Sequence, residues 1–144
     1  MSQIKTDILV VGSGIAGLTF AIKAAKNWPK RTITVLTKTV EGESNTRYAQ
    51  GGVAAVWNFE KDNFQKHIAD TLDAGDGLCK EDVVKIVVEE GRDRVQEIIN
   101  WGAHFDKEKN SEAYDLAREG GHSEHRILHY KDLTGWEMQR TVME

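Results

Sequence analysis

Two hydrophobic patterns follow one another near the start of the chain. Residues 7–11, DILVV, end in an apolar run that is typical of a strand in a parallel sheet covered on both faces. Apolar side chains then recur at helical spacing from Ile15 until Pro29, which cannot continue a helix. Residues 32–37, TITVLT, alternate and are rich in β-branched side chains, as in a second strand. The pattern predicts a βαβ unit over residues 6–38.

The next stretch fits neither period. Residues 42–56, GESNTRYAQGGVAAV, are mostly small and polar, with a pair of glycines. This stretch is too rich in small residues to be a solvated linker. We expect an ordered loop that runs into a short apolar strand or turn.

Two helices are predicted between residues 62 and 102. Asp62 is placed to cap the first, in which apolar side chains recur at i, i+4 and i+8 from Phe64. The second begins at Glu81 or Asp82, with four valines between Val83 and Val88 on one stripe, and either ends near Gly91 or continues past it toward Gly102. Gly102 is expected to be the glycine that follows its C-terminus.

The last part of the chain predicts two short elements. Residues 126–130, RILHY, have the pattern of a short strand. Thr134 and Glu137, three positions apart, are the signature of a capping box, so a final helix is expected to begin there.

Composition and charge narrow the function classes. The 144 residues correspond to about one domain, and 40% hydrophobic residues with 13 glycines is an ordinary globular composition. Nineteen basic against 23 acidic residues give a net charge of −4, which does not attract nucleic acid or an anionic membrane. The first apolar run is too short for a signal peptide or a membrane span. Cys79, the single cysteine, lies beside acidic residues and is expected to be inert in a reducing, cytoplasmic compartment.

A glycine motif connects the first predicted strand to the first predicted helix. It reads GSGIAG over residues 12–17. Gly12 would make the tight turn, Gly14 would let the backbone approach a pyrophosphate, and Gly17 would let helix and strand pack closely. The helix N-terminus adds unpaired N–H groups and a positive dipole end. Together these features predict a dinucleotide phosphate site.

The residue that usually selects the dinucleotide is missing. An acidic residue about 20 positions beyond the glycines commonly holds the adenosine ribose. Here the second strand is followed by Lys38, and no acidic residue occurs before Glu41. Lys38 could favour a phosphate, bind the ribose through its backbone, or be a solvated surface lysine.

Three separated motifs resemble one flavoprotein family. They are GSGIAGL, SNTRYAQGGVAAV at 44–56 and REGGHSEHRILHYKDLTG at 118–135. In this order they make the chain similar to the N-terminal part of the L-aspartate oxidases, within the fumarate reductase and succinate dehydrogenase flavoprotein family. The resemblance implies an α/β, Rossmann-like FAD-binding domain of the two-dinucleotide-binding-domain type, incomplete and with a helical insertion.

The same resemblance implies how the 144 residues are organised. They would form the N-terminal part of the FAD-binding domain, and the remainder of the parent enzyme would be absent. Its parts would be the βαβ unit 6–38, a flavin loop 42–56, a helical segment 62–102 and a substrate-side loop 118–125.

The resemblance also implies which residues bind FAD. A flavin needs backbone donors near its N5 and O4 edge with little side-chain bulk, which Ala49 to Gly52 can supply. In respiratory members of the family a histidine of this loop is joined covalently to the flavin, and Asn45 occupies the matching position, which implies FAD bound without a covalent link. The implied FAD-binding residues are Gly12, Ser13, Gly14, Ile15, Ala16, Gly17, Lys38, Ser44, Asn45, Thr46, Arg47, Tyr48, Ala49, Gln50, Gly51 and Gly52.

The third motif points to an amino-dicarboxylate substrate. The ammonium group of such a substrate needs a charge-assisted partner, and the corresponding stretch of fumarate and succinate enzymes usually lacks the acidic residue found here at Glu119. Glu119 would bind that ammonium group; the alternative is a surface ion pair with Arg118 or Arg126. His122 and Ser123 could hydrogen-bond a substrate carboxylate.

A metal site is not expected. His122, His125 and His129 would share a helix face and could bind zinc if they lay on a helix. Paired glycines precede them, however, and the predicted strand 126–130 interrupts any such helix.

The resemblance implies FAD-dependent oxidation of L-aspartate to iminoaspartate, the first step toward quinolinate and NAD. Oxygen or fumarate would reoxidise the flavin, and quinolinate synthase would be a partner. The family's catalytic arginine and substrate-binding histidines would lie beyond residue 144, so no catalytic residue is expected here and the chain alone should be inactive. The alternatives are a fumarate reductase or succinate dehydrogenase flavoprotein, and a non-catalytic nucleotide-binding fragment.

Overall fold

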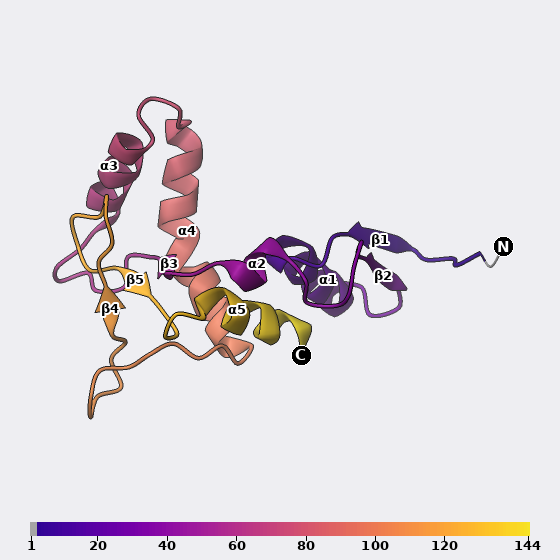
Figure 1. Ribbon diagram of the computed structural model, residues 1–144. Coiled ribbons are helices and arrows are strands. Elements are labelled where there is room, and N and C mark those ends of the chain that lie inside the picture. The colour runs from indigo at the N-terminus through magenta and orange to yellow at the C-terminus, as the bar shows by residue number, and fades with distance from the viewer. Residues whose placement is uncertain (1–2) are drawn as a thin grey trace. The chain divides into compact units, whose positions relative to one another are not determined.

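The computed structural model describes residues 3–144, which form two compact units. The first holds the described residues up to Ala49 together with Gly135–Glu144, and the second is Gln50–Thr134. The elements, labelled in Figure 1, are β1 (Ile8–Val11), α1 (Ile15–Asn27), β2 (Ile33–Leu36), α2 (Asn45–Tyr48), β3 (Val53–Ala54), α3 (Phe64–Ala74), α4 (Glu81–Asn100), β4 (Leu116–Ala117), β5 (Ile127–Leu128) and α5 (Thr134–Met143).

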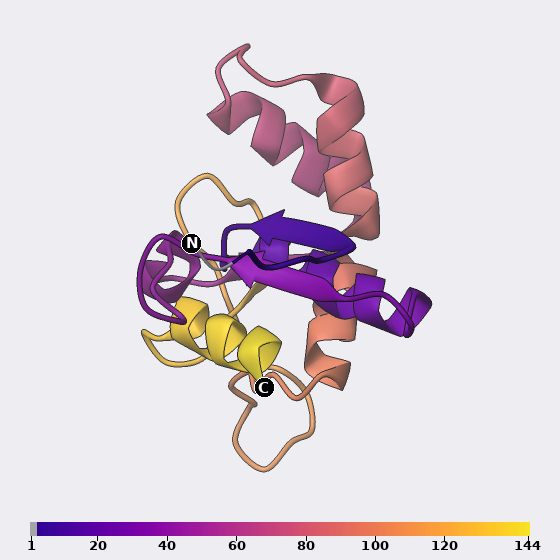
Figure 2. The same cartoon turned by 90° about the vertical axis from the view of Figure 1, so that its right-hand side faces the viewer.

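The first unit contains the predicted βαβ unit. Strands β1 and β2 are parallel, with Ile8 opposite Ile33, and Figure 2 shows them side by side. The prediction that the first strand is covered on both faces is wrong for the described chain. Only Val10 of β1 is buried, whereas Val11 is 76% exposed, because this sheet has just two strands within residues 3–144.

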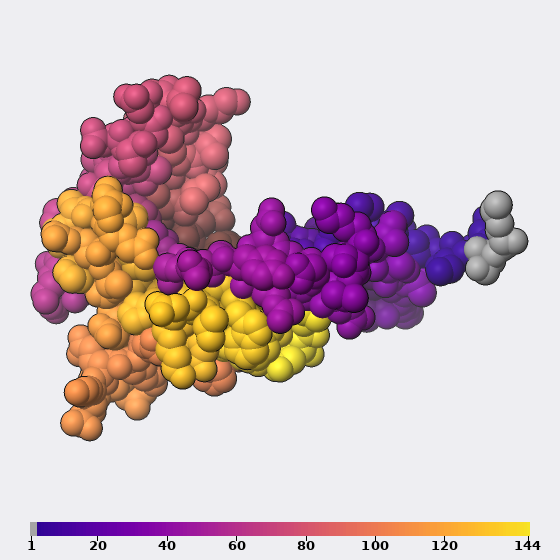
Figure 3. Space-filling model, viewed as in Figure 1, coloured from indigo at the N-terminus to yellow at the C-terminus, as the bar shows by residue number. Residues whose placement is uncertain are grey.

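The second unit combines a helical hairpin with a small antiparallel sheet. Helices α3 and α4 pack together, and the sheet has the order β3-β5-β4. The predicted strand near residues 126–130 is confirmed as β5, whereas β4 has no clear sequence signal. The space-filling view of Figure 3 shows the segment that precedes β5 lying against helix α3. In this contact the N–H of Ser123 donates to Asp70.

Helix α4 follows its predicted pattern in part. Val84 and Val88 are buried against the rest of the unit, but Val83 and Val87 are exposed. The helix ends as expected, because Gly102 has a positive φ of 106° and its N–H donates to the carbonyl oxygen of Ile99 at 2.9 Å.

Two predicted helix caps are wrong. Asn63 caps α3 by accepting the N–H of Lys66 at 2.9 Å, while Asp62 binds Arg126 instead. Thr134 does not form the predicted capping box. Its hydroxyl accepts the N–H of Tyr130 and donates to the carbonyl oxygen of Gly51, and neither bond involves Glu137.

The stretch 42–56 is more regular than its composition suggests. It contains the four-residue helix α2 as well as the expected short strand, β3. Ser44 caps α2 by accepting the N–H of Arg47. Within residues 3–144, none of the helices has the length and apolar character needed to cross a membrane.

Candidate functional site

The glycine motif forms a tight connection between β1 and α1. Gly12 has a positive φ of 110°, which few other residues adopt. A Cβ on Gly17 would collide with the carbonyl oxygen of Gly12 and lie 3.3 Å from Cγ1 of Val10. Gly12 is therefore needed for the turn and Gly17 for the close approach of the helix to the strand, as the motif predicts.

The N-terminus of α1 presents unpaired N–H groups. The side chain of Thr46 accepts the N–H of Ile15 at 3.1 Å and lies 3.5 Å from where a Cβ on Gly14 would be. Within residues 3–144, the N–H groups of Ser13, Gly14, Ala16 and Gly17 have no acceptor. Donors without partners at the positive end of a helix dipole suit a pyrophosphate.

A chain of polar contacts holds this loop in place. The hydroxyl of Ser13 donates to that of Thr37 at 3.0 Å, and the amide nitrogen of the Gln139 side chain donates to the carbonyl oxygen of Ser13 at 2.9 Å. Ser44 in turn donates to the side-chain oxygen of Gln139 at 2.7 Å. Gln139 is buried and lies in α5, so no local pattern in the sequence connects it to the glycine motif.

An open cavity of about 780 Å³ adjoins Ser13 and Gly14, two of the residues with unpaired N–H groups. Its volume fits part of a dinucleotide, its lining combines apolar surface with hydroxyl groups, and the exposed Lys38 lies on its wall. The hydroxyl of Tyr48 donates to Glu43 at 2.6 Å, and this bond raises the pKa of Tyr48. The lining residues are Val11, Gly12, Ser13, Gly14, Leu36, Thr37, Lys38, Thr39, Glu43, Ser44, Asn45, Thr46 and Tyr48.

The cavity brings together half of the residues predicted to bind FAD. Gly12, Ser13, Gly14, Lys38, Ser44, Asn45, Thr46 and Tyr48 line it. Ile15, Ala16, Gly17, Arg47 and Ala49 lie in the same unit but not on its wall, and Gln50, Gly51 and Gly52 belong to the second unit. The prediction that these eight residues bind FAD therefore rests on the sequence motifs alone.

Within the second unit, the paired glycines lie against the predicted substrate residue. Gly51 has a φ of 68°, and a Cβ there would lie 2.7 Å from Oε1 of Glu119. A Cβ on Gly52 would collide with the side chain of Ile127 and the carbonyl oxygen of Leu128. The backbone of the predicted flavin loop thus passes close to the Glu119 carboxylate.

Glu119 is exposed and makes no ion pair within residues 3–144. The predicted alternative pairing with Arg126 is wrong, because Arg126 is fully occupied elsewhere. Its guanidinium donates two hydrogen bonds of 2.8 Å to Asp62 and a further one to Asp70. Since nothing in the described chain neutralises Glu119, its carboxylate remains available to a cation.

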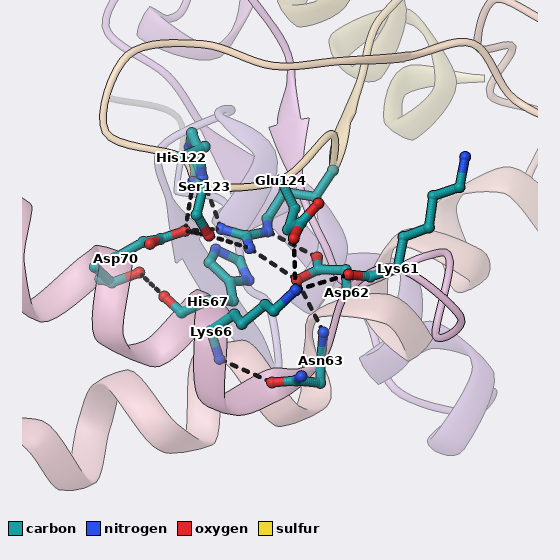
Figure 4. Close-up of polar contacts among 11 residues, drawn as sticks. Lys61, Asp62, Asn63, Lys66, His67, Asp70, His122, Ser123 and Glu124 are labelled. Carbon is teal, nitrogen blue, oxygen red and sulfur yellow. Dashed lines mark hydrogen bonds and ion pairs between the residues drawn. The ribbon is translucent and has the colours of Figure 1, made fainter.

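The buried Arg126 contacts Asp62, Asp70, His122 and Ser123. Figure 4 labels these four partners and the neighbouring His67. Desolvation opposes the charge of Arg126, but its two carboxylate partners outweigh it and raise the pKa of the guanidinium. Desolvation also opposes the charge of Asp70, yet hydrogen bonds from Ser123 and Arg126 lower its pKa to about 2. The sequence predicted no role for Asp70 and only a surface pairing with Glu119 for Arg126, because Arg126 and its two aspartate partners are more than 50 positions apart.

The three histidines of the third motif have separate partners. His122 Nδ1 lies 3.2 Å from Arg126, His125 Nδ1 lies 2.9 Å from the carbonyl oxygen of Leu116, and His129 Nδ1 lies 3.1 Å from Asp106. Within residues 3–144, no group of three potential ligands is placed to hold a metal ion.

Known proteins resemble the chain over nearly its whole length. The L-aspartate oxidase 2-a of Nicotiana tabacum is 47% identical over 138 residues, which cover 96% of this chain and 21% of that protein. The L-aspartate oxidase of Vibrio cholerae is 44% identical and is covered to 26% of its length. A quinol fumarate reductase FrdA of E. coli has a TM-score of 0.90 at 33% identity, covering 99% of this chain and 24% of that one.

The chain therefore spans about a quarter of the length of the relatives it matches. The profile of the family described as FAD binding domain matches residues 7–144. This match includes the glycine motif, the cavity beside it and the Glu119 loop. The chain belongs to the FAD binding domain family, and FAD is its cofactor.

Proposed function

We propose that this chain is the N-terminal part of an FAD-dependent enzyme that oxidises L-aspartate to iminoaspartate. The observation that carries the proposal is the unpaired carboxylate of Glu119 beside the backbone of Gly51. An ammonium group bound there would lie next to the loop predicted to follow the flavin. The names of the relatives in Nicotiana tabacum and Vibrio cholerae support the same substrate.

The residues of the chain divide into two roles. FAD, when bound, supplies an acceptor for the hydride from the substrate Cα. The unpaired N–H groups at the start of α1 would hold its pyrophosphate, and Lys38 would lie at the wall of the same cavity. Glu119 would bind the substrate ammonium group, and His122 would donate from Nε2 to a substrate carboxylate.

A chimera tests the role of Glu119. Residues 7–144 would replace the matching part of the Vibrio cholerae L-aspartate oxidase, which supplies the remaining domains. Removing a hydrogen bond to a charged group costs about 1.5–3 kcal/mol. Glu119→Gln should therefore lower kcat/KM for aspartate oxidation by roughly 10- to 150-fold, with fumarate reduction changed less than about threefold.

The control is Glu108→Gln, which removes another exposed glutamate from the same unit. It should leave both activities near those of the unsubstituted chimera. Equal losses of aspartate oxidation and fumarate reduction in Glu119→Gln would contradict the proposed role. They would favour the second candidate, a fumarate reductase or succinate dehydrogenase flavoprotein, which the fold similarity to FrdA supports.

We further propose that FAD is bound without a covalent link, because Asn45 lacks the ring nitrogen that joins the flavin in respiratory members. Acid precipitation of the yellow chimera should release the flavin into the supernatant. Flavin retained on the precipitate would contradict this proposal. The 144-residue chain alone should show no aspartate oxidation, and its absorbance spectrum would tell whether it holds flavin or is a non-catalytic nucleotide-binding fragment.

The product would be an unstable imine, so an enzyme that consumes it quickly, such as quinolinate synthase, is the proposed partner. Oxygen or fumarate would accept the electrons. The lone cysteine agrees with a reducing, cytoplasmic location.

A further inference from the structure

We infer that Arg126, held between Asp62 and Asp70, is a positioning residue that fixes the substrate-side loop and orients His122 and Ser123. The inference rests on the proposed function, since it assigns this loop to substrate binding. The three residues Arg126, Asp62 and Asp70 thereby receive a role although none of them faces the substrate.

The side chain of Arg126 is rigidly held. It is fully buried, and its Nε and Nη2 atoms donate to the two oxygens of Asp62 at 2.8 Å each. Such a two-bond fork fixes the plane of the guanidinium. Asp62 precedes α3 and is itself 2% exposed, so the anchor is part of the core of the second unit.

Asp70 connects this anchor to the loop. Its Oδ2 atom accepts the N–H and the hydroxyl of Ser123, each at 2.8 Å, and also a bond from Arg126 Nη1. Three donors on one carboxylate oxygen hold the backbone at Ser123 against helix α3. The segment 119–123 is therefore fixed at its C-terminal end by Asp70.

Arg126 also determines the orientation of His122. A guanidinium can only donate, so His122 Nδ1, 3.2 Å away, must accept. The neutral imidazole then carries its proton on Nε2, which can donate to a carboxylate oxygen. The N–H of His122 donates to the carbonyl oxygen of Glu119 at 3.2 Å, so the two predicted substrate residues are coupled by one turn of backbone.

The same geometry changes the role predicted for Ser123 from the sequence. Its hydroxyl proton is donated to Asp70, and Arg126 Nη2 lies 3.5 Å from its oxygen. A substrate carboxylate at this hydroxyl would face the negative charge of Asp70. Ser123 therefore anchors the loop, and substrate contact is left to Glu119 and His122.

The test uses Asp70→Asn, which keeps the shape of the side chain and removes its charge. Hydrogen exchange in the 144-residue chain should show the Ser123 amide exchanging at least about tenfold faster, with the amides of α4 unchanged. The control Asp73→Asn, an exposed position on the same helix, should change neither. Unchanged exchange at Ser123 in Asp70→Asn would overturn the inference.

Kinetics in the chimera separate positioning from general stability. If the substrate itself has to order the loop, binding becomes weaker while the geometry of the bound state stays the same. KM for L-aspartate should therefore rise about tenfold or more, with kcat within about threefold. A merely structural role would lower the amount of active enzyme, and so apparent kcat, at constant KM. That second pattern would also overturn the inference.

Failure of the proposed function has a different signature. If Glu119→Gln leaves the preference for aspartate unchanged, the proposed substrate is wrong, but Asp70→Asn should still accelerate exchange at Ser123. The positioning role is therefore tested both by hydrogen exchange in the 144-residue chain and by the kinetics of the chimera.

Discussion

At the scale of single residues, the glycines of the first motif do two distinct jobs. Gly12 allows a backbone angle that side chains disfavour, whereas Gly17 allows contact between a helix and the turn before it. The contact at Gly17 involves the backbone oxygen of Gly12 and cannot be relieved by turning a flexible side chain. The second job is therefore the one most sensitive to added volume.

Gly17→Ala should destabilise the first unit. The new Cβ would overlap a backbone carbonyl, and such overpacking costs about 1–3 kcal/mol. Urea denaturation of the 144-residue chain, followed by a probe in α1 or β1, measures the change. The matched control is Gly91→Ala in α4, where a Cβ would meet nothing within 4 Å. There the helix propensity of alanine should stabilise the chain by about 0.5–1 kcal/mol, and a loss at both sites would contradict the steric argument.

The glycine motif could be predicted from the sequence because its residues are neighbours and each has a specific geometric role. Thr46, which binds the N–H of Ile15, was implied at this site only by the family resemblance, and Gln139, which binds the carbonyl oxygen of Ser13, was not predicted there. They reach it only after the chain has folded back on itself. The polar contacts that complete the site depend on tertiary structure, which local periodicity does not contain.

At the scale of elements, hydrophobic periodicity predicted the helices better than their ends. Helices α1 and α4 form where the apolar stripes predict them, although only Ala24 of α1 and half of the four-valine stripe of α4 are buried. The caps at Asp62 and Thr134 were predicted wrongly because both side chains found stronger tertiary partners. Asp62 pairs with a buried guanidinium, and Thr134 binds the backbone of Gly51. A short polar side chain caps a helix only when no such partner competes.

Thr134 gives a direct test of that competition. Its hydroxyl is buried, accepts the N–H of Tyr130 at 3.0 Å and donates to the carbonyl oxygen of Gly51 at 2.7 Å. Thr134→Val keeps the shape but leaves both groups unsatisfied, so it should lower the free energy of unfolding by about 1–3 kcal/mol. Thr134→Ser, which keeps the hydroxyl, should lower the free energy of unfolding by less. Equal losses in the two variants would show that packing, not hydrogen bonding, dominates at this position.

At the scale of the whole molecule, buried ionisable groups make stability depend on pH. The second unit buries Asp62, His67 and Arg126, with the partly exposed Asp70 and His122 beside them (Figure 4). His67 is 6% exposed and its Nδ1 has no hydrogen-bond partner. Desolvation, reinforced by the positive charge of Arg126, lowers the pKa of His67. This imidazole is therefore buried in its neutral form.

His67 and Asp70 should lower the stability of the chain in two separate steps as the pH falls. Below the ordinary histidine pKa of 6.5 the unfolded chain binds a proton that folded His67 resists, so stability decreases from there downward. The pKa of Asp70 is lowered from 3.8 to about 2, so its full contribution of roughly 2 kcal/mol to the free energy of unfolding is present above about pH 4. This contribution disappears as the pH falls through about 2.

Urea denaturation of the 144-residue chain between pH 8 and pH 2 measures both steps, and substitutions assign them. His67→Phe removes the titrating group and the unsatisfied nitrogen, so the slope of stability against pH between 7 and 5 should flatten. Asp70→Asn should instead flatten the slope between pH 4 and pH 2 and lower stability at neutral pH, because Arg126 then keeps only Asp62 as a charged partner. If His67→Phe left the upper slope unchanged, the acid sensitivity would have to come from groups other than His67.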